Sequence, residues 1–216
     1  MYAAIFDLDG VIVLAEPFEI ASINETLAPF NISFDFDYFI NRFSGQGSRS
    51  IFEQIIKERQ LDVDIEELLR EKRRRMEEKV ETQTIPVVPG VLEFIKQLRE
   101  QHVPFMVGTG GDKTTARKKL EKIGLDIDII ATEDVKRGKP APDIYLACAK
   151  HLRVDPSSCV VFEDAPSGVH AAKSAGMKCV GVLTDTDEKH LLDAGADKTI
   201  KNFEGLEWER LIEELF

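Results

Sequence analysis

The stretch AAIFDLDGV, residues 3–11, decides the fold because a short apolar strand runs directly into two carboxylates one residue apart. Side chains in an extended segment repeat with a period of two, so Asp7 and Asp9 start on the same side, and Gly10 lets the chain turn. Two crowded carboxylates are unfavourable unless a cation lies between them or one of them keeps its proton. Asp and Gly also end ordinary strands in turns, so this stretch alone leaves a chemical site and a plain turn equally open.

Three further polar clusters each follow an apolar run that is typical of a buried strand. They are GTGG at residues 108–111, GKP at 138–140 and ED at 163–164. The apolar runs alternate with helical patterns, which predicts βαβ units and a parallel sheet. In such a sheet, sites form in the crevice beyond the carboxyl ends of the strands. We therefore expect these clusters to meet the two aspartates at one edge of the sheet.

The length and charge of the chain limit its class. A length of 216 residues with 43% apolar content fits one core domain with a sizeable insertion. The formal net charge of -11 argues against a nucleic-acid partner, because binding to a phosphate backbone depends on clustered Lys and Arg. The sequence shows no signal-peptide pattern and no apolar run of membrane-spanning length, so we expect a cytoplasmic protein with no membrane partner. Nothing in the pattern demands more than a monomer.

The three cysteines, Cys148, Cys159 and Cys179, are odd in number and lack the spacing of a metal site. Their apolar surroundings predict buried free thiols in a reducing compartment. A disulfide between Cys159 and Cys179 across neighbouring strands is the alternative.

A continuous helical region separates the first strand from the other predicted strands. Apolar residues recur at helical spacing from Ile20 to Val80, and no strand-like stretch interrupts them. The sequence therefore predicts an α/β fold with a Rossmann-like parallel-sheet core at residues 1–14 and 84–216. A small all-helical cap domain at residues 15–83 is expected to be inserted after the first strand.

Strands and helices alternate regularly after residue 90. Helices are expected at residues 91–98, 112–124, 144–152, 166–176 and 206–216, and late strands at 178–183 and 198–200. Asp112 is a candidate N-cap, and Gly124 is a candidate left-handed stop at the C-terminus of a helix.

The clusters at the strand ends together suit a phosphate monoester. Backbone N–H groups after Thr109, beginning with that of Gly110, can donate to phosphate oxygens at the start of a helix. The Thr109 hydroxyl adds another donor, and Lys139 supplies positive charge. These residues are therefore candidates for binding the phosphate group.

The acidic residues at the strand ends suit a divalent cation. Asp7 and Asp164, with Glu163 nearby, are hard oxygen ligands of the kind that Mg²⁺ prefers, and the ion would let a carboxylate approach a phosphate dianion. Asp7 can then attack phosphorus. Asp9, kept partly protonated by its neighbours, would protonate the leaving alkoxide and later accept a proton from the water that hydrolyses the aspartyl-phosphate.

Each cluster taken alone is more often an ordinary turn or loop than a site. Their conjunction is different, because four independent clusters in this order at strand ends rarely arise from turn chemistry alone.

This ordered set of motifs resembles that of the haloacid dehalogenase-like hydrolase superfamily, in particular its β-phosphoglucomutase-like branch of phosphatases with a helical cap. The resemblance covers nearly the whole chain and implies Mg²⁺ as the cofactor. Matched to the family's motifs, Asp7 is implied to be the nucleophile, and Asp9 the acid/base, whose backbone carbonyl is also a metal ligand. Thr109 is implied to bind the phosphate, and Lys139 to bridge the nucleophile and the phosphate. Asp164 is implied to be a metal ligand, and Glu163 to act mainly through water.

Three departures from the family's pattern bear on the substrate. Residues 14–17 read LAEP where many relatives have DSEP, which removes a polar pair at the hinge of the cap. Glu19 stands where mutases and many sugar phosphatases have a histidine, and an acid there would repel a phosphate. The segment GQGSR at residues 45–49 resembles the cap loop that meets the substrate. Gln46 and Arg49 are therefore candidate contacts, although Arg49 could equally be ordinary surface charge.

We therefore expect a phosphatase that acts on a small phosphorylated metabolite, a sugar or polyol phosphate. A sugar-phosphate mutase is the alternative within enzymes. A low-turnover module that binds a phosphorylated metabolite is the alternative outside them, which the altered residues at positions 14, 15 and 19 would permit.

Overall fold

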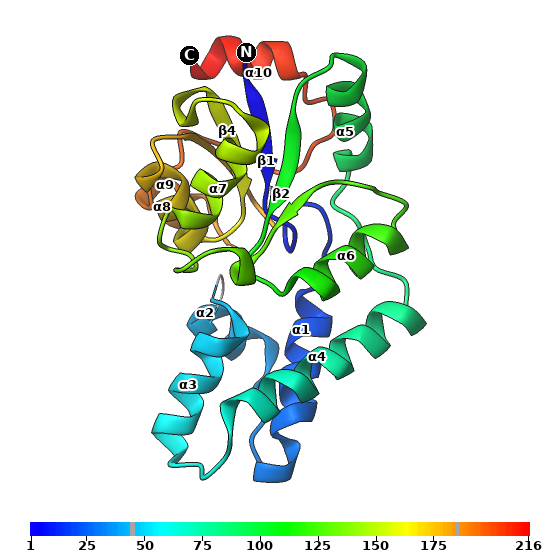
Figure 1. Ribbon diagram of the computed structural model, residues 1–216, viewed down its shortest axis with the longest axis vertical. Helices are drawn as coiled ribbons and strands as arrows, with labels where there is room; N and C mark the ends of the chain where they lie inside the picture. Colours follow the sequence, from blue (N-terminus) through cyan, green and yellow to red (C-terminus); the bar gives the residue numbers. More distant parts are fainter. Residues whose placement is uncertain (44–45, 185) are drawn as a thin grey trace.

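A six-stranded parallel sheet forms the centre of the computed structural model, which describes residues 1–43, 46–184 and 186–216. The strand order is β3-β2-β1-β4-β5-β6 (Figure 1). The strands are β1 (Ala3–Phe6), β2 (Phe105–Gly108), β3 (Ile129–Ile130), β4 (Cys159–Glu163), β5 (Lys178–Val182) and β6 (Lys198–Ile200). The predicted α/β class with a Rossmann-like parallel sheet is confirmed, and β1 lies in the middle of the sheet.

Strand β1 is apolar along its whole length because helices cover both faces of the sheet. Its four side chains have no exposed surface. Ala4 and Phe6 belong to the apolar cluster on one face, and Ala3 and Ile5 belong to the cluster on the other. A continuous apolar run, rather than an alternating one, is what a parallel strand buried on both faces requires.

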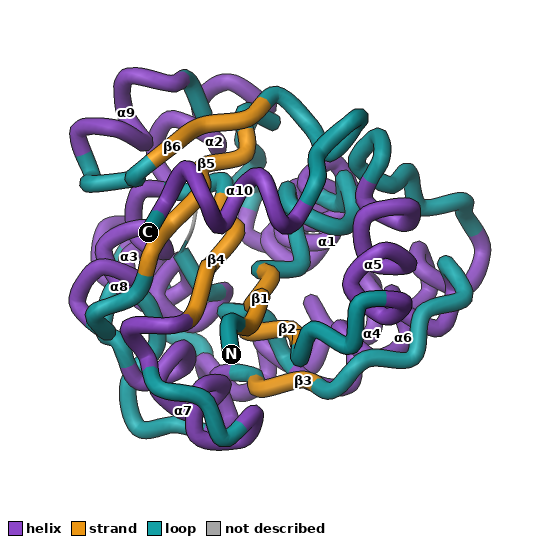
Figure 2. The backbone as a smooth tube through the Cα atoms, turned by 90° about the horizontal axis from the view of Figure 1, so that it is seen from above, coloured by secondary structure: helices purple, strands orange, loops and turns teal. Residues whose placement is uncertain are grey.

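Helices of the core divide between the two faces of the sheet. The Phe6 face is covered by α5 (Val91–Glu100), α6 (Lys113–Lys122) and α10 (Trp208–Leu215), and the Ile5 face by α7 (Asp143–Leu152), α8 (Pro166–Ser174) and α9 (Glu188–Asp193). Figure 2 shows α7, α8 and α9 on one side of the strands, with α5 and α6 on the other. Asp112 caps α6 by accepting from the Thr115 N–H, and Gly124 has a φ of 76°, as predicted. Helix α9 is the one described core helix that the sequence does not predict.

The helices between β1 and α5 gather at one end of the molecule. They are α1 (Glu16–Leu27), α2 (Phe36–Phe43), α3 (Ser48–Arg59) and α4 (Ile65–Thr82), and we refer to them as the cap helices. They enclose an apolar cluster of their own that includes Ile23, Phe43 and Phe52. Figure 1 shows them at the end opposite both chain termini. The domain boundaries at residues 15 and 83 stay a prediction. None of the described helices is long and apolar enough to cross a membrane.

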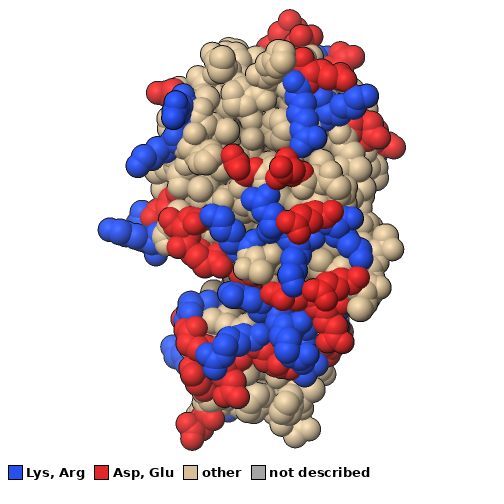
Figure 3. All heavy atoms as spheres, turned by 45° about the vertical axis from the view of Figure 1, so that its right-hand side comes forward, with Lys and Arg blue, Asp and Glu red and all other residues tan. Residues whose placement is uncertain are grey.

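Ion pairs join the cap helices to the core where α4 meets α6. Lys118 Nζ lies 2.8 Å from a carboxylate oxygen of Glu77 and 3.0 Å from one of Glu81. Lys122 Nζ donates to the Glu81 carbonyl oxygen at 2.8 Å. Figure 3 shows acidic and basic side chains interspersed on the face of the molecule that carries this junction. Apolar packing adds to these ion pairs, because Met76 and Val80 of α4 belong to the same buried cluster as Phe6 of the sheet.

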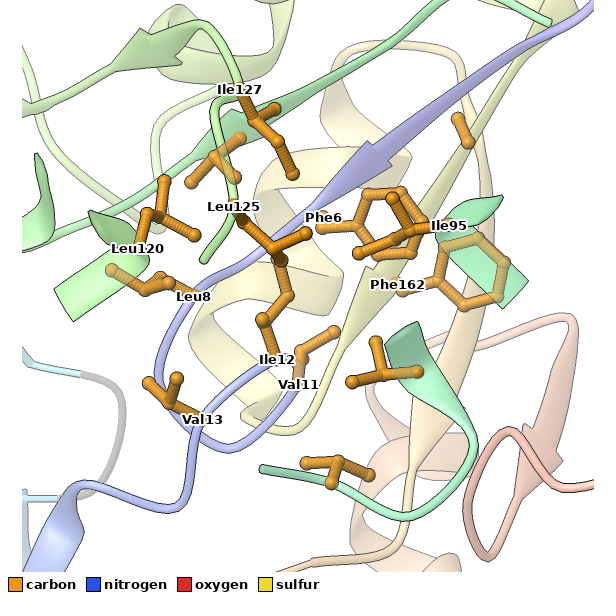
Figure 4. Close-up of a cluster of buried hydrophobic side chains, with 14 of the residues drawn as sticks. Phe6, Leu8, Val11, Ile12, Val13, Ile95, Leu120, Leu125, Ile127 and Phe162 are labelled. Atoms are coloured by element: carbon orange, nitrogen blue, oxygen red, sulfur yellow. The ribbon is translucent and has the colours of Figure 1, made fainter. Parts of the chain in front are cut away.

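The loop after β1 is anchored by its apolar side chains. Leu8, Val11, Ile12 and Val13 are at most 1% exposed. Figure 4 shows them in the same cluster as Phe6. Because Leu8 is drawn into the core, the aspartates on either side of it are directed away from the core. The polar motif is therefore held in place by the apolar residues between and after its acids.

The cysteines are buried free thiols, as expected, and no disulfide joins Cys159 to Cys179. Cys148, Cys159 and Cys179 are free and buried. Burial raises the pKa of Cys148 to about 12 and that of Cys159 to about 11. These thiols therefore stay neutral at physiological pH.

Candidate active site

The carboxyl ends of β1, β2 and β4 open into one cavity that reaches the cap helices. The cavity brings together Asp7, Asp9, Thr109, Gly110, Lys139, Glu163 and Asp164. On the cap side it is lined by Glu16, Glu19, Phe39, Ile40, Phe43, Gln46, Gly47, Ser48 and Ile51.

Lys139 joins carboxylates from two neighbouring strands. Its Nζ donates to Asp7 Oδ1 at 2.7 Å and to Glu163 Oε1 at 2.6 Å, and its side chain is only 6% exposed. It also lies over the Tyr145 ring, 4.9 Å from the ring centroid. Burial alone would lower the pKa of Lys139, but the two carboxylates more than offset this and raise it above its usual value. Lys139 is therefore a permanently charged ammonium.

Glu163 is held by donors of the protein at both oxygens. Oε1 accepts from Lys139 and from the Tyr145 hydroxyl at 2.5 Å, and Oε2 accepts from the backbone N–H groups of Asp164 and Ala165 at 3.1 and 3.2 Å. Gly168 makes room for it, because a Cβ at that position would lie 1.6 Å from Glu163 Oε1. Glu163 thus acts as a fixed anchor for Lys139. A direct bond to a metal would cost it one of these contacts, whereas a contact through water would not.

Three carboxylates at the strand ends could hold a metal ion. Asp7, Glu163 and Asp164 each offer an oxygen, and these atoms lie within 4.8 Å of one another. Ligands on opposite sides of Mg²⁺ are about 4.2 Å apart, twice the usual bond of about 2.1 Å. The oxygens are therefore close enough to share one ion after a small adjustment, and carboxylates suit a hard cation. Asp7 and Asp164 are therefore candidates for direct ligands, and Glu163 is a candidate for contact through water.

Gly10 makes the space that Asp164 fills. Its φ is 77°, a left-handed value that favours glycine, and a Cβ there would lie 2.1 Å from Asp164 Oδ2. The Thr184 hydroxyl donates to the Gly10 carbonyl oxygen at 2.8 Å and fixes the turn from the other side. Both the backbone conformation and the close approach of Asp164 therefore require glycine at this position.

Thr109 is buried at the end of β2 and orders the glycine-rich loop. Its Oγ1 accepts from the Gly111 N–H at 3.0 Å, and the Thr132 hydroxyl donates to the Gly110 carbonyl oxygen at 2.7 Å. The Gly111 N–H, which the sequence predicts to be a phosphate donor, therefore already donates to Thr109. The Thr109 hydroxyl keeps its own hydrogen for donation into the cavity.

Asp9 is paired with a lysine that the sequence does not single out. Lys119 Nζ donates to Asp9 Oδ1 at 2.6 Å and to Oδ2 at 2.8 Å. Burial would lower the pKa of Lys119, but Asp9 and Glu19 outweigh it and raise the pKa above its usual value. The charged group in contact with Asp9 is therefore an ammonium, and not the acidic neighbour that the sequence suggests.

The acid at position 19 is neutralised within the cap helices. Glu19 pairs with the buried Lys72 of α4 and accepts from the Ser48 hydroxyl at 3.3 Å. Burial would raise the pKa of Glu19, but Lys72 and Lys119 offset this and hold it below its usual value. Glu19 therefore stays ionised, with its charge balanced by cations before any substrate arrives.

The two cap residues suggested as substrate contacts lie in different places. Gln46 lines the cavity, where its side chain contacts Ser50, Gln54 and the Arg42 carbonyl oxygen. Arg49 is not among the residues that line the cavity. Its guanidinium is exposed and lies 2.6 Å from Glu66. Gly45 of the same suggested loop lies outside the described residues.

The burial of Asp7 predicts a pH-dependent stability of the metal-free protein. Burial raises the pKa of Asp7 from 3.8 to about 7, with Lys139 opposing the rise and Glu163 adding to it. The folded state therefore holds a proton that the unfolded state releases between about pH 4 and 7, so stability falls as the pH rises through this window, by at most about 1.4 kcal/mol per pH unit. Urea unfolding in EDTA at pH 5, 6 and 7 measures this. Asp7→Asn lacks the titrating group, and equal pH slopes for the two proteins would contradict the prediction.

Three residues of the site are missed by the reasoning from sequence. Tyr145 follows Ile144 on the buried face of a predicted helix. A buried tyrosine hydroxyl needs a hydrogen-bond partner, so the position of Tyr145 was the signal for a nearby polar group. Lys72 and Lys119 lie in runs of charged residues that predict a solvated surface, and the structure buries both.

Comparisons with known proteins place the chain in a family. Residues 4–182 match the family model of the haloacid dehalogenase-like hydrolases. The fructose-1-phosphate phosphatase YqaB of Escherichia coli is 35% identical over 181 residues, which cover 82% of this chain and 94% of that protein. The β-phosphoglucomutase of Bacillus subtilis is 30% identical over 223 residues, covering 99% of this chain and 95% of that one.

A solved structure extends the likeness to three dimensions. CbbY from Rhodobacter sphaeroides in complex with phosphate superposes with a TM-score of 0.86 at 25% identity, covering 95% of this chain and 96% of that one. The likeness in structure therefore extends over nearly the whole chain. The chain belongs to the haloacid dehalogenase-like hydrolases, in their β-phosphoglucomutase-like branch.

Proposed function

We propose that this phosphoric monoester hydrolase is a Mg²⁺-dependent phosphatase that releases phosphate from a small sugar or polyol phosphate. The observation that carries the proposal is the arrangement around Lys139. One buried ammonium contacts both Asp7 and Glu163, and Asp164 lies close enough to share a cation with Asp7. A carboxylate between an ammonium and a cation site can approach a phosphate dianion without prohibitive repulsion.

The metal-binding part of the proposal rests on the donor set. Asp7 and Asp164 would hold Mg²⁺ directly, and the family resemblance adds the Asp9 backbone carbonyl and a water-mediated contact from Glu163. When bound, the ion would neutralise phosphate charge and act as a Lewis acid on the phosphoryl oxygens.

Asp7 is the proposed nucleophile. Its carboxylate attacks phosphorus, and an aspartyl-phosphate forms as the bond to the ester oxygen breaks. Lys139 orients one Asp7 oxygen and balances the added negative charge. The Thr109 hydroxyl and the Gly110 N–H would bind phosphoryl oxygens at the start of α6.

Asp9 is the proposed acid and base. It gives a proton to the leaving alkoxide in the first half of the reaction. In the second half it accepts a proton from the water that attacks the aspartyl-phosphate, which returns Asp7 to its free carboxylate. Both acids line the same cavity, as this sequence of steps requires.

The cap side of the cavity favours a small, hydroxylated leaving group. Phe39, Phe43 and Ile51 offer apolar surface to the C–H groups of a sugar, while Glu19 and Ser48 offer oxygens to its hydroxyls. Relatives that act on phosphorylated sugars support the same substrate class.

A phosphate-release screen tests this function. The panel contains fructose 1-phosphate, glucose 6-phosphate, sorbitol 6-phosphate, glycerol 1-phosphate and p-nitrophenyl phosphate, each with Mg²⁺ and with EDTA. We expect Mg²⁺-dependent release from at least one sugar or polyol phosphate. Interconversion of phosphosugar isomers without net release would favour the mutase. Tight binding of phosphosugars without any turnover would favour the binding module.

The close approach of Gly10 and Asp164 gives a sharper prediction. Gly10→Ala is expected to lower kcat by about 10²-fold, because a Cβ at this position must displace the proposed metal ligand Asp164. Gly124→Ala is the matched control, since Gly124 has a φ of 76° and nothing within 4 Å of an added Cβ. It carries the same backbone strain and should lose only stability. Equal kcat values for the two variants would rule out the displacement of Asp164 as the cause.

A further inference from the structure

Lys119 is a buried cation that the proposed mechanism does not use. It lies on α6, and its side chain is only 4% exposed. Its Nζ is within 2.8 Å of both oxygens of Asp9. A contact with both oxygens fixes the rotation of the carboxyl group as well as its position, which a contact with one oxygen would not do.

The same ammonium also faces the cap helices. The negative charges of Glu19 and Glu16, both on α1, raise the pKa of Lys119 together with the charge of Asp9. Glu19 in turn pairs with Lys72 on α4. Lys119 is therefore the link between the proposed acid/base of the core and a charged network of the cap helices.

We propose that Lys119 is the positioning residue for proton transfer by Asp9. This inference rests on the proposed function, in which Asp9 protonates the leaving alkoxide. The Asp9 side chain is 33% exposed, and removing Lys119 takes away the ammonium that contacts both of its oxygens. A misplacement of about 1 Å can cost about 10²-fold in rate.

The leaving group of the substrate separates this role from a structural one. Lys119→Met removes the donor at similar volume. It is expected to lower kcat/KM about 30-fold for the best sugar phosphate of the panel, whose alkoxide needs a proton to leave. For p-nitrophenyl phosphate, whose phenolate leaves without one, the loss should stay below about 3-fold. Lys119→Arg keeps two donors in a fork and should restore the sugar phosphate reaction to within about 5-fold.

Lys118→Met is the matched control. Lys118 is the neighbouring lysine of the same helix and contacts Glu77 and Glu81 instead of Asp9. Lys118→Met should leave unchanged the ratio of kcat/KM for the sugar phosphate to kcat/KM for p-nitrophenyl phosphate. Thermal unfolding confirms that each variant is folded, and if Lys119→Met is not, Lys119→Gln takes its place. An equal loss on both substrates, no loss, or a gain on the sugar phosphate would each overturn the proposal.

Asp9→Asn distinguishes failure of this inference from failure of the proposed function. If Asp9→Asn loses activity selectively on the sugar phosphate and Lys119→Met does not, only the role of Lys119 is wrong. If Asp9→Asn shows no such selectivity, the acid/base role of Asp9 is wrong, and the inference falls with it.

Discussion

Asp7→Asn should lower kcat by about 10⁴-fold or more on every phosphate ester that the protein hydrolyses. An amide of nearly the same shape keeps the contact with Lys139 but cannot form the aspartyl-phosphate. Initial rates with the best substrate of the panel, at saturating Mg²⁺, measure the effect.

The same variant must be shown to fold and to bind. Urea unfolding at pH 7 should give a stability at least equal to that of the parent, because Asn removes a carboxylate that burial disfavours. Substrate binding should persist, which isothermal titration can detect without turnover. Retention of full phosphatase activity by Asp7→Asn would remove Asp7 as the nucleophile.

Lys139→Met should impair both stability and turnover. The change leaves Asp7 and Glu163 buried without the ammonium between them. Removing one partner of a buried ion pair lowers the free energy of unfolding by about 3–5 kcal/mol. We expect kcat to fall by about 10³-fold, because the nucleophile loses its orienting donor and the pKa of Asp7 rises further. Since protonation of Asp7 relieves the unpaired charge, the loss of stability in EDTA should be greater at pH 8 than at pH 5.5.

Lys136→Met is the control for Lys139→Met. Lys136 belongs to the same loop and is exposed, so its replacement should change neither stability nor kcat by more than a small factor. Urea unfolding and initial rates on the same preparations compare the two variants. A stable, active Lys139→Met protein would show that the Asp7 and Glu163 carboxylates need no internal cation.

The sheet and the centre of the cavity could be predicted from the sequence because local patterns encode them. Apolar runs mark the parallel strands, and the topology of a parallel sheet brings the ends of those strands together. Asp7, Thr109, Lys139 and Asp164 could therefore be gathered into one cavity without knowledge of any side-chain contact.

The buried lysines could be identified only in part. Lys72 lies four residues after Leu68 and four before Met76, and Lys119 lies three after Ala116, so both occupy the apolar faces of their helices. Helical periodicity thus gave a signal that the surrounding charged residues obscured. Their partners Glu19 and Asp9 are far away in the chain, and no local pattern reports a contact between segments so distant.

The direction of Arg49 and the existence of α9 depend on tertiary structure. A long cationic side chain on a helix surface can pair with any acid within reach, and Arg49 pairs with Glu66 of α4. Helix α9 spans six residues and buries only Leu191, which is too short a stretch for periodicity to appear.

Because the three native thiols are buried, the outer surface of the described residues carries no cysteine. A cysteine introduced on α3 and another on α5 would therefore be the sites where maleimide dyes attach, with no native cysteine replaced. Energy transfer between the two dyes would then follow the separation of cap and core in solution while substrate is added.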